Sequence, residues 1–226
     1  MTAIKTARAR AREELTREIK EEARRRLASE GAQRLSLRAV ARELGMASSA
    51  LYRYFPSRDE LLTALIVDAY TDLADAVDGA LATASPAPRA RWRALCTAAR
   101  DWARAHPHEY ALVFGTPVPG YQAPQETIEP AARLPLALIG VAASAQLDGA
   151  PVGGVLGAQL AAVREHLAPD LAESVLARAA IAWTQLFGMI GFELFGHLVG
   201  TLDPADAFFA YTVERMADFV GLPDTE

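Results

Sequence analysis

The stretch LSLRAVARELGMASSALYRYFPSRDELL, residues 35–62, decides the fold of this chain. Ser36 can cap a short helix because its hydroxyl can accept a hydrogen bond from a backbone N–H one turn further on. Apolar residues then recur at helical spacing, and Gly45 suits the left-handed conformation that ends a helix and turns the chain. A second short helix, over 47–55, ends where Pro56 excludes helical geometry from the residue before it. Two short helices joined by so few residues must cross steeply, which predicts a helix-turn-helix.

Longer helices are expected on both sides of this stretch. Apolar residues at every fourth position predict a helix over 16–30, which Gly31 ends. On the other side, Ser57 and Glu60 form a capping box that starts a helix reaching about residue 81. This connecting helix is long enough to leave a small N-terminal domain and enter a larger one.

The spacing of these residues resembles the DNA-binding domain of the TetR/AcrR family of bacterial transcriptional regulators. That family has a capping Ser or Thr, an apolar residue followed by Ala, a turn Gly, an aromatic-rich recognition helix, and a basic residue before Glu and paired leucines. The match covers roughly the first quarter of the chain. It departs at Ala47, where the family often has Ser or Thr as the cap of the recognition helix, so that capping here passes to Ser48 or Ser49. The matching residues are Ser36, Val40, Ala41, Gly45, Leu51, Tyr52, Arg53, Tyr54, Phe55, Arg58, Glu60, Leu61 and Leu62.

A recognition helix enters the major groove, and the side chains of its N-terminal half reach the base edges. The reading positions are therefore short side chains, and only Arg53 could form a bidentate bond to guanine or, alternatively, bind phosphate. The resemblance implies that Tyr52, Tyr54 and Arg58 contact the DNA backbone. The predicted DNA-binding residues are Ser36, Ser48, Ser49, Ala50, Tyr52, Arg53, Tyr54 and Arg58.

Charge is distributed unevenly along the 226 residues, whose net charge is −5. Residues 1–60 hold 14 basic and 9 acidic residues, and the rest of the chain holds 9 basic and 19 acidic. A basic end joined to an acidic body fits a protein that presents one end to a polyanion. The basic arm over 1–14 either contacts DNA or is a solvated tail, and it either frays or extends the first helix. Arg24, Arg25 and Arg26 are expected to form a solvated face, with contact to DNA phosphate as the less favoured alternative.

The rest of the chain is helical in pattern, with no convincing period-2 segment. The predicted fold class is all-α: an N-terminal three-helix helix-turn-helix domain, residues 1–62 with the connecting helix beginning at 57, and a C-terminal helical-bundle domain for ligand binding and dimerisation, residues 63–226. The expected helices of the second domain span about 89–106, 108–114, 127–146, 155–167 and 171–200, with Asp170 as the cap of the last of these. A final helix is expected to have Pro204 in its first turn and Asp203 as its cap.

The last two helices suit a dimer interface, because Gly188, Gly191 and Gly196 allow two helices to approach closely. The family resemblance implies the same pairing with the two-fold mate. Trp102, His106 and Gly115 also resemble a C-terminal domain type of this family, although that match names no ligand.

Aromatic residues of the larger domain could converge on an apolar cavity with a few polar groups. For any single one of them plain core is the favoured interpretation, whereas the family resemblance favours a pocket lined by some subset. The candidate ligand-binding residues are Trp102, His106, Tyr110, Phe114, Tyr121, Trp183, Phe187 and Glu193.

Other classes of protein find little support. The chain has no phosphate-binding Gly-rich loop, no nucleophile elbow and no paired carboxylates in an apolar setting, so we expect no enzyme and no cofactor. His106 and His108 flank a rigid proline, which argues against a metal site. Polar residues interrupt the apolar segment 171–200, which predicts a buried helix and no membrane span. The single cysteine, Cys96, and the charged N-terminus predict a cytoplasmic protein without an intrachain disulfide.

These expectations converge on a homodimeric transcriptional regulator that binds a palindromic operator in double-stranded DNA. We expect it to be a repressor that is released when an unidentified small-molecule effector binds, although activation stays open. The alternative is a small-molecule-binding helical protein that has lost specific DNA reading, which the short side chains at 48–50 would favour.

Overall fold

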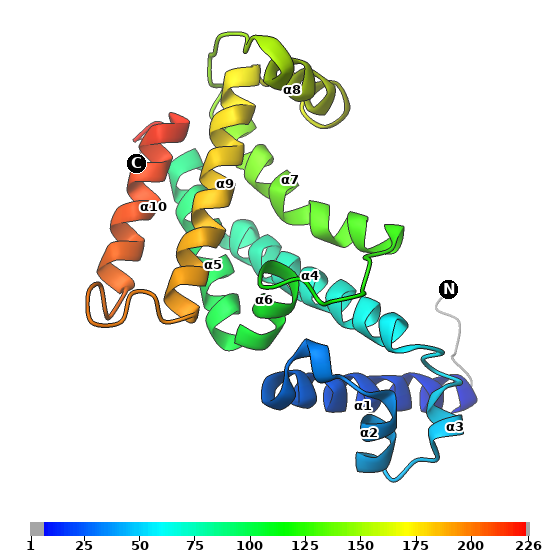
Figure 1. The fold of residues 1–226 in the computed structure, drawn as a ribbon. Helices are drawn as coiled ribbons and strands as arrows, with labels where there is room; N and C mark the ends of the chain where they lie inside the picture. The colour runs from blue at the N-terminus through cyan, green and yellow to red at the C-terminus, as the bar shows by residue number, and fades with distance from the viewer. Residues whose placement is uncertain (1–6, 225–226) are drawn as a thin grey trace. The chain divides into compact units, whose positions relative to one another are not determined.

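The structure, a computed structural model, describes residues 7–224 and consists of helices and loops, with no strand in that range (Figure 1). The predicted all-α class is confirmed. In chain order the helices are α1 (Ala7–Glu30), η1 (Ala32–Arg34), α2 (Leu37–Glu43), α3 (Ser48–Leu51), α4 (Arg58–Thr83), α5 (Pro88–Ala105), α6 (Pro107–Phe114), η2 (Gln125–Thr127), α7 (Ile128–Ser144), α8 (Gly154–Leu167), α9 (Glu173–Leu194) and α10 (Asp206–Val220), where η marks a 3₁₀ turn.

The chain folds into two compact units, and α4 runs without interruption from one to the other. Unit 1 holds residues up to 70 together with 107–128, and unit 2 holds 71–106 together with the residues from 129 onward. The domain boundary that we predict at residue 62 therefore falls inside a continuous helix. Helix α6 and the loop after it pack with the N-terminal helices in unit 1.

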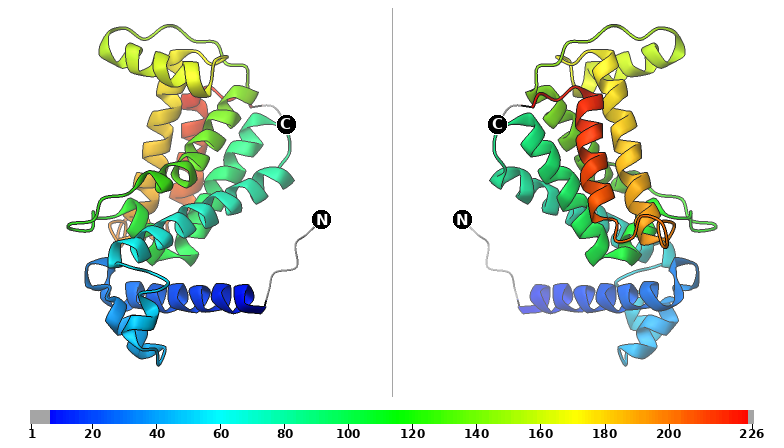
Figure 2. Two further views of the ribbon diagram at one scale, coloured as in Figure 1. Left: turned by 90° about the vertical axis from the view of Figure 1, so that its right-hand side faces the viewer. Right: turned by 90° about the vertical axis from the view of Figure 1, so that its left-hand side faces the viewer.

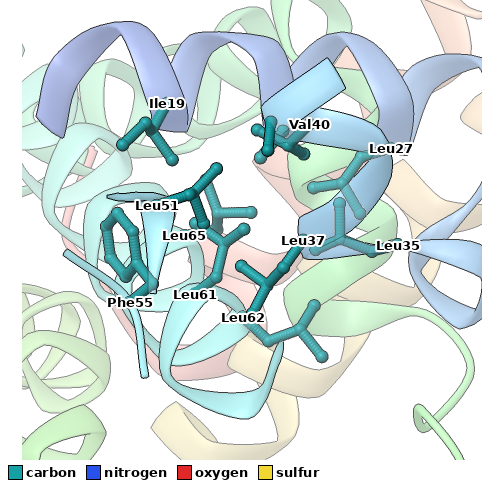
Figure 3. Close-up of a cluster of buried hydrophobic side chains, with 12 residues drawn as sticks. Ile19, Leu27, Leu35, Leu37, Val40, Leu51, Phe55, Leu61, Leu62 and Leu65 are labelled. Atoms are coloured by element: carbon teal, nitrogen blue, oxygen red, sulfur yellow. The ribbon is translucent and has the colours of Figure 1, made fainter. Parts of the chain in front are cut away.

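A cluster of buried apolar side chains holds the helices of unit 1 together (Figure 3). Helix α4 supplies three leucines to it, so the helix-turn-helix shares its core with the start of the connecting helix. Truncating one such leucine to alanine costs about 2–5 kcal/mol in typical cores. The labelled members are Ile19 and Leu27 of α1, Leu35, Leu37 and Val40 in and before α2, Leu51 of α3, Phe55, and Leu61, Leu62 and Leu65 of α4.

The ends of the long helices in unit 1 follow local rules. Gly31 has a φ of 77° and closes α1, because its N–H bonds the carbonyl of Leu27. Ser57 caps α4, since its hydroxyl accepts a bond from the backbone N–H of Glu60 at 3.1 Å. Helix α1 begins no later than Ala7, so the described part of the basic arm, residues 7–14, extends the first helix. Residues 1–6 lie outside the described range.

Ion pairs correct our expectation of a solvated arginine face on α1. Arg24 and Lys20 both bind the carboxylate of Asp68 on α4, at 2.5 and 2.7 Å. Arg26 is mostly buried and pairs with Glu22. Only Arg25 keeps an exposed side chain. The basic residues in this half of α1 therefore serve packing against α4 and internal charge balance.

In unit 2, α9 and α10 lie side by side, and both pack against α5 (Figures 1 and 2). Two buried arginines of α5 have carboxylate partners, as burial of a charge demands. Arg100 donates to both oxygens of Glu193 at 2.7 Å, and Arg89 donates to Asp218 at 2.6 Å. The indole N–H of Trp92 donates to the carbonyl of Val213 at 2.9 Å. These bonds fix the last two helices against α5.

Several predicted helix ends in unit 2 are wrong. Helix α9 has Ala172, not Asp170, as its N-cap, and it ends at Leu194, because Gly196 and Gly200 have positive φ and turn the chain. Helix α10 begins at Asp206 with Ala205 as its N-cap, so Asp203 and Pro204 precede the helix.

Candidate functional site

The turn between α2 and α3 forms as the sequence predicts. Gly45 has a φ of 64°, which permits the sharp reversal, and the N–H of Met46 bonds back to the carbonyl of Ala41 at 2.8 Å. Leu51 is fully buried and anchors α3 in the core of unit 1. Ser36 is the N-cap of α2, but its side chain makes no capping bond, so that detail of the prediction is wrong.

The expected recognition helix is shorter than the predicted span 47–55. Helix α3 covers Ser48–Leu51, and its N-cap Ala47 offers no side-chain bond. The chain then tightens, because the N–H of Tyr54 bonds the carbonyl of Leu51 at 2.8 Å, three residues back. Tyr52 and Arg53 lie in this last turn and are exposed. Ser49 is exposed, and Ser48 and Ala50 are half-buried, so this surface offers small side chains followed by one tyrosine and one arginine.

The structure gives Arg58 an internal set of partners. Its guanidinium donates to the carbonyl of Ala32 at 2.9 Å and to those of Leu35 and Gln33 at 3.2 and 3.3 Å. These carbonyls lie in the connection between α1 and α2, so Arg58 fixes that connection to the start of α4. Contact of Arg58 with a DNA phosphate stays a prediction.

Tyr54 is half-buried, and the guanidinium of Arg12 lies 5.4 Å from the centre of its ring. A cation at this distance from the face of an aromatic ring is attracted to it. The start of α1 therefore lies beside residues 52–54, the turn that follows α3, which we call the recognition turn.

Unpaired arginines mark a surface of unit 1 that we call the free-arginine surface. The exposed arginines on α2 and around it have no carboxylate within ion-pair distance among the described residues, in contrast to Arg17, Arg24, Arg25 and Arg26 of α1. Arg38 and Arg42 are absent from the predicted set, although their i, i+4 spacing on the polar face of a short helix was a usable signal. The exposed arginines without such a partner are Arg8, Arg10, Arg12, Arg34, Arg38, Arg42 and Arg53. The free-arginine surface consists of those on α2 and directly after α3, which are Arg38, Arg42 and Arg53.

The predicted ligand-binding residues are divided between the two units. Tyr110, Phe114 and Tyr121 belong to unit 1, where the ring centres of Tyr110 and Phe114 are 5.1 Å apart. The hydroxyl of Tyr121 is hydrogen-bonded to that of Thr63 at 2.9 Å. These three side chains pack around α4 and α6 within unit 1.

The other candidates lie in unit 2 and have separate environments. The ring of His106 stacks on Trp102, and its Nδ1 lies 3.0 Å from the carbonyl oxygen of Trp102. Glu193 is held by the guanidinium of Arg100. Phe187 is buried. Trp102 and His106 therefore pack on each other, while Glu193 and Phe187 have separate surroundings; the indole nitrogen of Trp102 is buried without a partner.

Trp183 is the candidate that lines a cavity. The cavity has a volume of about 210 Å³ and lies between α7, α8 and α9. All of its lining side chains are apolar apart from the indole N–H of Trp183, and that nitrogen is buried without a partner. Pro135 interrupts the hydrogen bonding of α7 at the cavity wall, which the sequence did not lead us to predict. The lining residues are Pro135, Leu138, Ile139, Leu160, Val163, Leu167, Leu176, Ala179, Ala180 and Trp183.

The chemistry of the remaining polar residues offers little for catalysis. Among residues 7–224 no group of three or more His, Cys, Asp or Glu side chains is arranged to hold a metal ion. Cys96 is buried, and this burial raises the pKa of its thiol well above the ordinary value, which keeps it protonated. Helix α9 is long and apolar enough to span a membrane, but half of its most apolar window is buried in the protein, as in core helices of soluble proteins.

A helix-turn-helix with unpaired arginines around it, joined by one helix to an all-helical unit with an apolar cavity, defines a DNA-binding transcriptional regulator. Residues 19–65 match the family described as "Bacterial regulatory proteins, tetR family", and residues 92–216 match "Tetracyclin repressor-like, C-terminal domain". The chain belongs to the TetR family of transcriptional regulators.

Individual relatives agree with this assignment. An HTH-type transcriptional regulator of Mycobacterium tuberculosis is 37% identical over 215 residues, which cover 89% of this chain and 91% of that protein. A relative of the same description from Mycobacterium bovis matches equally well. The crystal structure of a regulatory protein named SCO4313 superposes with a TM-score of 0.80 at 36% identity, covering 94% of this chain and all of that one. A Rhodococcus sp. RHA1 protein of unknown function superposes with a TM-score of 0.69 at 26% identity, covering 92% and 95% of the two chains.

Proposed function

We propose that this protein is a homodimeric repressor that binds a palindromic operator in double-stranded DNA and leaves it when a small apolar molecule occupies unit 2. The observation that carries the DNA-binding part is the free-arginine surface beside α3. Unpaired guanidinium groups supply the phosphate contacts that dominate affinity for duplex DNA. The residues proposed to contact DNA are Ser36, Ser48, Ser49, Ala50, Tyr52, Arg53, Tyr54 and Arg58, to which we add Arg38 and Arg42.

Because the side chains on α3 are small, they can make few direct contacts to the edges of the bases. Ser49 can bond either a base or a phosphate, and Ala50 can contact a thymine methyl group. Arg53, in the turn after α3, has the longest hydrogen-bond donor among residues 48–53. We therefore propose that specificity combines a few direct contacts with the shape and deformability of the duplex.

Dimerisation is supported by an exposed stripe along α9. Ile181, Gly188, Phe192 and Phe195 follow one another at helical spacing, and the three apolar side chains are each about half exposed. Tyr211 and Phe219 on the neighbouring α10 are also exposed. An apolar surface of this kind marks an interface in soluble proteins. We propose that α9 and α10 of two protomers meet there.

The effector is proposed to bind in the cavity between α7, α8 and α9. An engineered cavity of about 150 Å³ lined by apolar residues binds benzene, so a cavity of about 210 Å³ suits a neutral molecule of roughly ten non-hydrogen atoms. A charged group would lose hydration there without gaining a charged partner, because the only polar side-chain group among the described lining residues is the neutral indole N–H of Trp183. The other candidate ligand-binding residues have packing partners of their own, which leaves Trp183 as the proposed contact among them.

A route from this cavity to the DNA-binding residues runs through helices that are bonded in series. Helix α7 carries cavity residues and also Arg133, which binds Asp75 and Asp78 on the second half of α4. The first half of α4 carries Asp68, which holds Lys20 and Arg24 of α1. A ligand that displaces α7 would therefore displace α4. Coupling between two sites is typically worth about 1–3 kcal/mol, enough to weaken operator binding by about 5–150-fold.

The proposal is tested by selecting duplexes from a random pool with the purified protein and measuring affinity at several KCl concentrations. We expect enrichment of a palindromic site and a steep fall of affinity with salt. Equal affinity for any duplex, or none, would instead support the alternative of a ligand-binding protein without specific DNA reading.

A further inference from the structure

Charge is segregated along α1. Residues 7–12 contain three arginines and no acidic residue, whereas residues 13–30 contain five basic and six acidic residues. The basic residues of the second segment have carboxylate partners, such as Glu14 and Glu21 for Arg17. Within the described part of the chain, Arg8, Arg10 and Arg12 have none. The first quarter of this helix is therefore cationic, and the charges of the rest are compensated.

The cationic segment, residues 7–12, has one arginine side-chain contact among the described residues, that of Arg12 with Tyr54. Arg8, Arg10 and Arg12 are exposed, and Figure 2 shows these first turns of α1 projecting past α2 and α3. Arginines at the start of a helix also face the positive end of the helix dipole, which is unfavourable. Neither burial nor helix stability explains this charge, whereas a polyanionic partner does.

The contact between Arg12 and Tyr54 defines which face of α1 points toward the recognition turn. Arg8 lies four residues earlier, on the same face and about 5–6 Å further along. Arg10 lies two residues from each, about 200° around the helix from Arg8, and so on the opposite face. A guanidinium stacked on a ring keeps its in-plane N–H donors free, so Arg12 can hold Tyr54 and still bind phosphate.

We propose that Arg8 and Arg12 form a phosphate-binding ridge that extends the DNA interface from Tyr54 onto the backbone next to each half-site. This inference rests on the proposed operator binding. Duplex DNA is favoured as the occupant because the ridge is continuous with the recognition turn through Tyr54 and has the complementary charge. Arg8 provides a contact that only DNA longer than the recognition site can reach.

The test compares four variants of the full chain on one duplex selected by the wild type, with flanking base pairs on both sides. R8Q removes one of the two ridge charges, and R8K keeps it. R10Q makes the same change on the opposite face, and R17Q makes it at a paired arginine. All three positions are exposed, so circular dichroism and the thermal midpoint should match the wild type. Fluorescence anisotropy at several KCl concentrations gives the slope of log Kobs against log[KCl].

We expect R8Q to make this slope shallower by about 0.9 for each phosphate that is no longer neutralised, which is about 1.8 for a dimer with two ridges. R8K should keep most of the slope, and R10Q and R17Q should keep it. On a duplex without the flanking base pairs, the salt slope of the wild type should fall to that of R8Q.

An unchanged salt slope in R8Q would contradict the ridge proposal. An equal reduction of the slope in R8Q and R10Q would also contradict it, because the effect would then depend on net charge alone. If R8Q keeps its slope but no longer binds immobilised polyglutamate, the ridge belongs to an acidic protein partner, and the proposal is wrong. If the wild type enriches no duplex, the proposed function itself is wrong. If the wild type binds DNA and R8Q binds identically, only the ridge is wrong.

Discussion

Arg133 of α7 donates a hydrogen bond from Nη2 to Asp78 of α4 at 2.5 Å, and the same nitrogen lies 2.7 Å from Asp75. This nitrogen therefore fastens a wall of the apolar cavity to the helix that supplies leucines to the helix-turn-helix core. The side chains are partly exposed, so the bonds contribute little to stability in themselves. In the proposed release mechanism these bonds matter more for the coupling of the two sites than for folding.

We expect R133Q to separate ligand binding from DNA release. Operator affinity without ligand should stay within about twofold of the wild type, and the thermal midpoint should change little, because exposed pairs are worth about 0–1 kcal/mol. With naphthalene as the ligand, the fall in operator affinity should be several-fold smaller than in the wild type. Anisotropy titrations with and without naphthalene measure both quantities. A full response in R133Q would show that the coupling runs elsewhere.

Arg53 and Arg58 should differ in what their replacement affects. R53Q removes an exposed donor without internal partners among the described residues, so it should weaken operator binding and leave the free energy of unfolding unchanged. R58Q leaves carbonyls of the α1–α2 connection without a charged donor, and should cost about 1–2 kcal/mol of stability. Urea denaturation and anisotropy on the same preparations distinguish them. Equal stability of the two variants would contradict the assigned role of Arg58.

Filling the cavity should abolish ligand binding. A180L places three extra carbon atoms at a lining position of α9, whereas A162L makes the same change at an exposed position of α8 outside the apolar cavity. Naphthalene should bind the wild type and A162L but not A180L, as measured by calorimetry. 2-Naphthoate has the same rings with a carboxylate, and it should bind none of the three, because the cavity offers its charge no charged partner. Tight binding of 2-naphthoate by the wild type would contradict the apolar assignment.

The dimer proposal can be tested at a glycine. A Cβ atom added at Gly188 would meet no other atom within 4 Å, and the same is true of Gly140 on α7. Arginine is also a better helix former than glycine, by up to about 1 kcal/mol. Both G188R and G140R should therefore fold. Sedimentation velocity should show G188R as a monomer and G140R with the mass of the wild type, and a dimeric G188R would place the interface elsewhere.

The helix-turn-helix could be predicted from sequence because its determinants are local. Gly45 has the positive φ that the turn requires, Pro56 ends the recognition turn, and Ser57 caps α4, each within a few residues of the feature it controls. Helix lengths were less predictable. Ser36 occupies the cap position without making the bond, since the sequence gives the residue type but not the side-chain rotamer.

The ligand site could not be predicted in the same way. Aromatic residues such as Tyr110 and Trp183 look alike in sequence, but one packs in unit 1 and the other lines the cavity in unit 2. Which helix faces meet is decided by packing between distant segments. The pairing of Arg24 with Asp68, and the absence of any such partner for Arg38 among residues 7–224, are equally non-local, so the separation of structural from free arginines required the structure.

Acid should weaken the packing of α10 on α5 through Glu214. Hydrogen bonds from Arg93, at 2.5 Å, and from Arg89 lower the pKa of this carboxyl below its ordinary value, against the opposing effect of desolvation. A group whose pKa is lower in the folded state stabilises the protein above its unfolded pKa, which is about 4.3 for glutamate, and this contribution is lost as the pH falls through the folded value. Urea denaturation at several pH values should therefore show E214Q less stable than the wild type at pH 7. The difference should hold down to about pH 5 and shrink below about pH 4.

E165Q, at an exposed glutamate of α8 without an ion-pair partner in residues 7–224, is the control and should follow the wild type throughout. A difference between E214Q and the wild type that persisted undiminished into strong acid would mean that Glu214 acts through its shape and not through its charge.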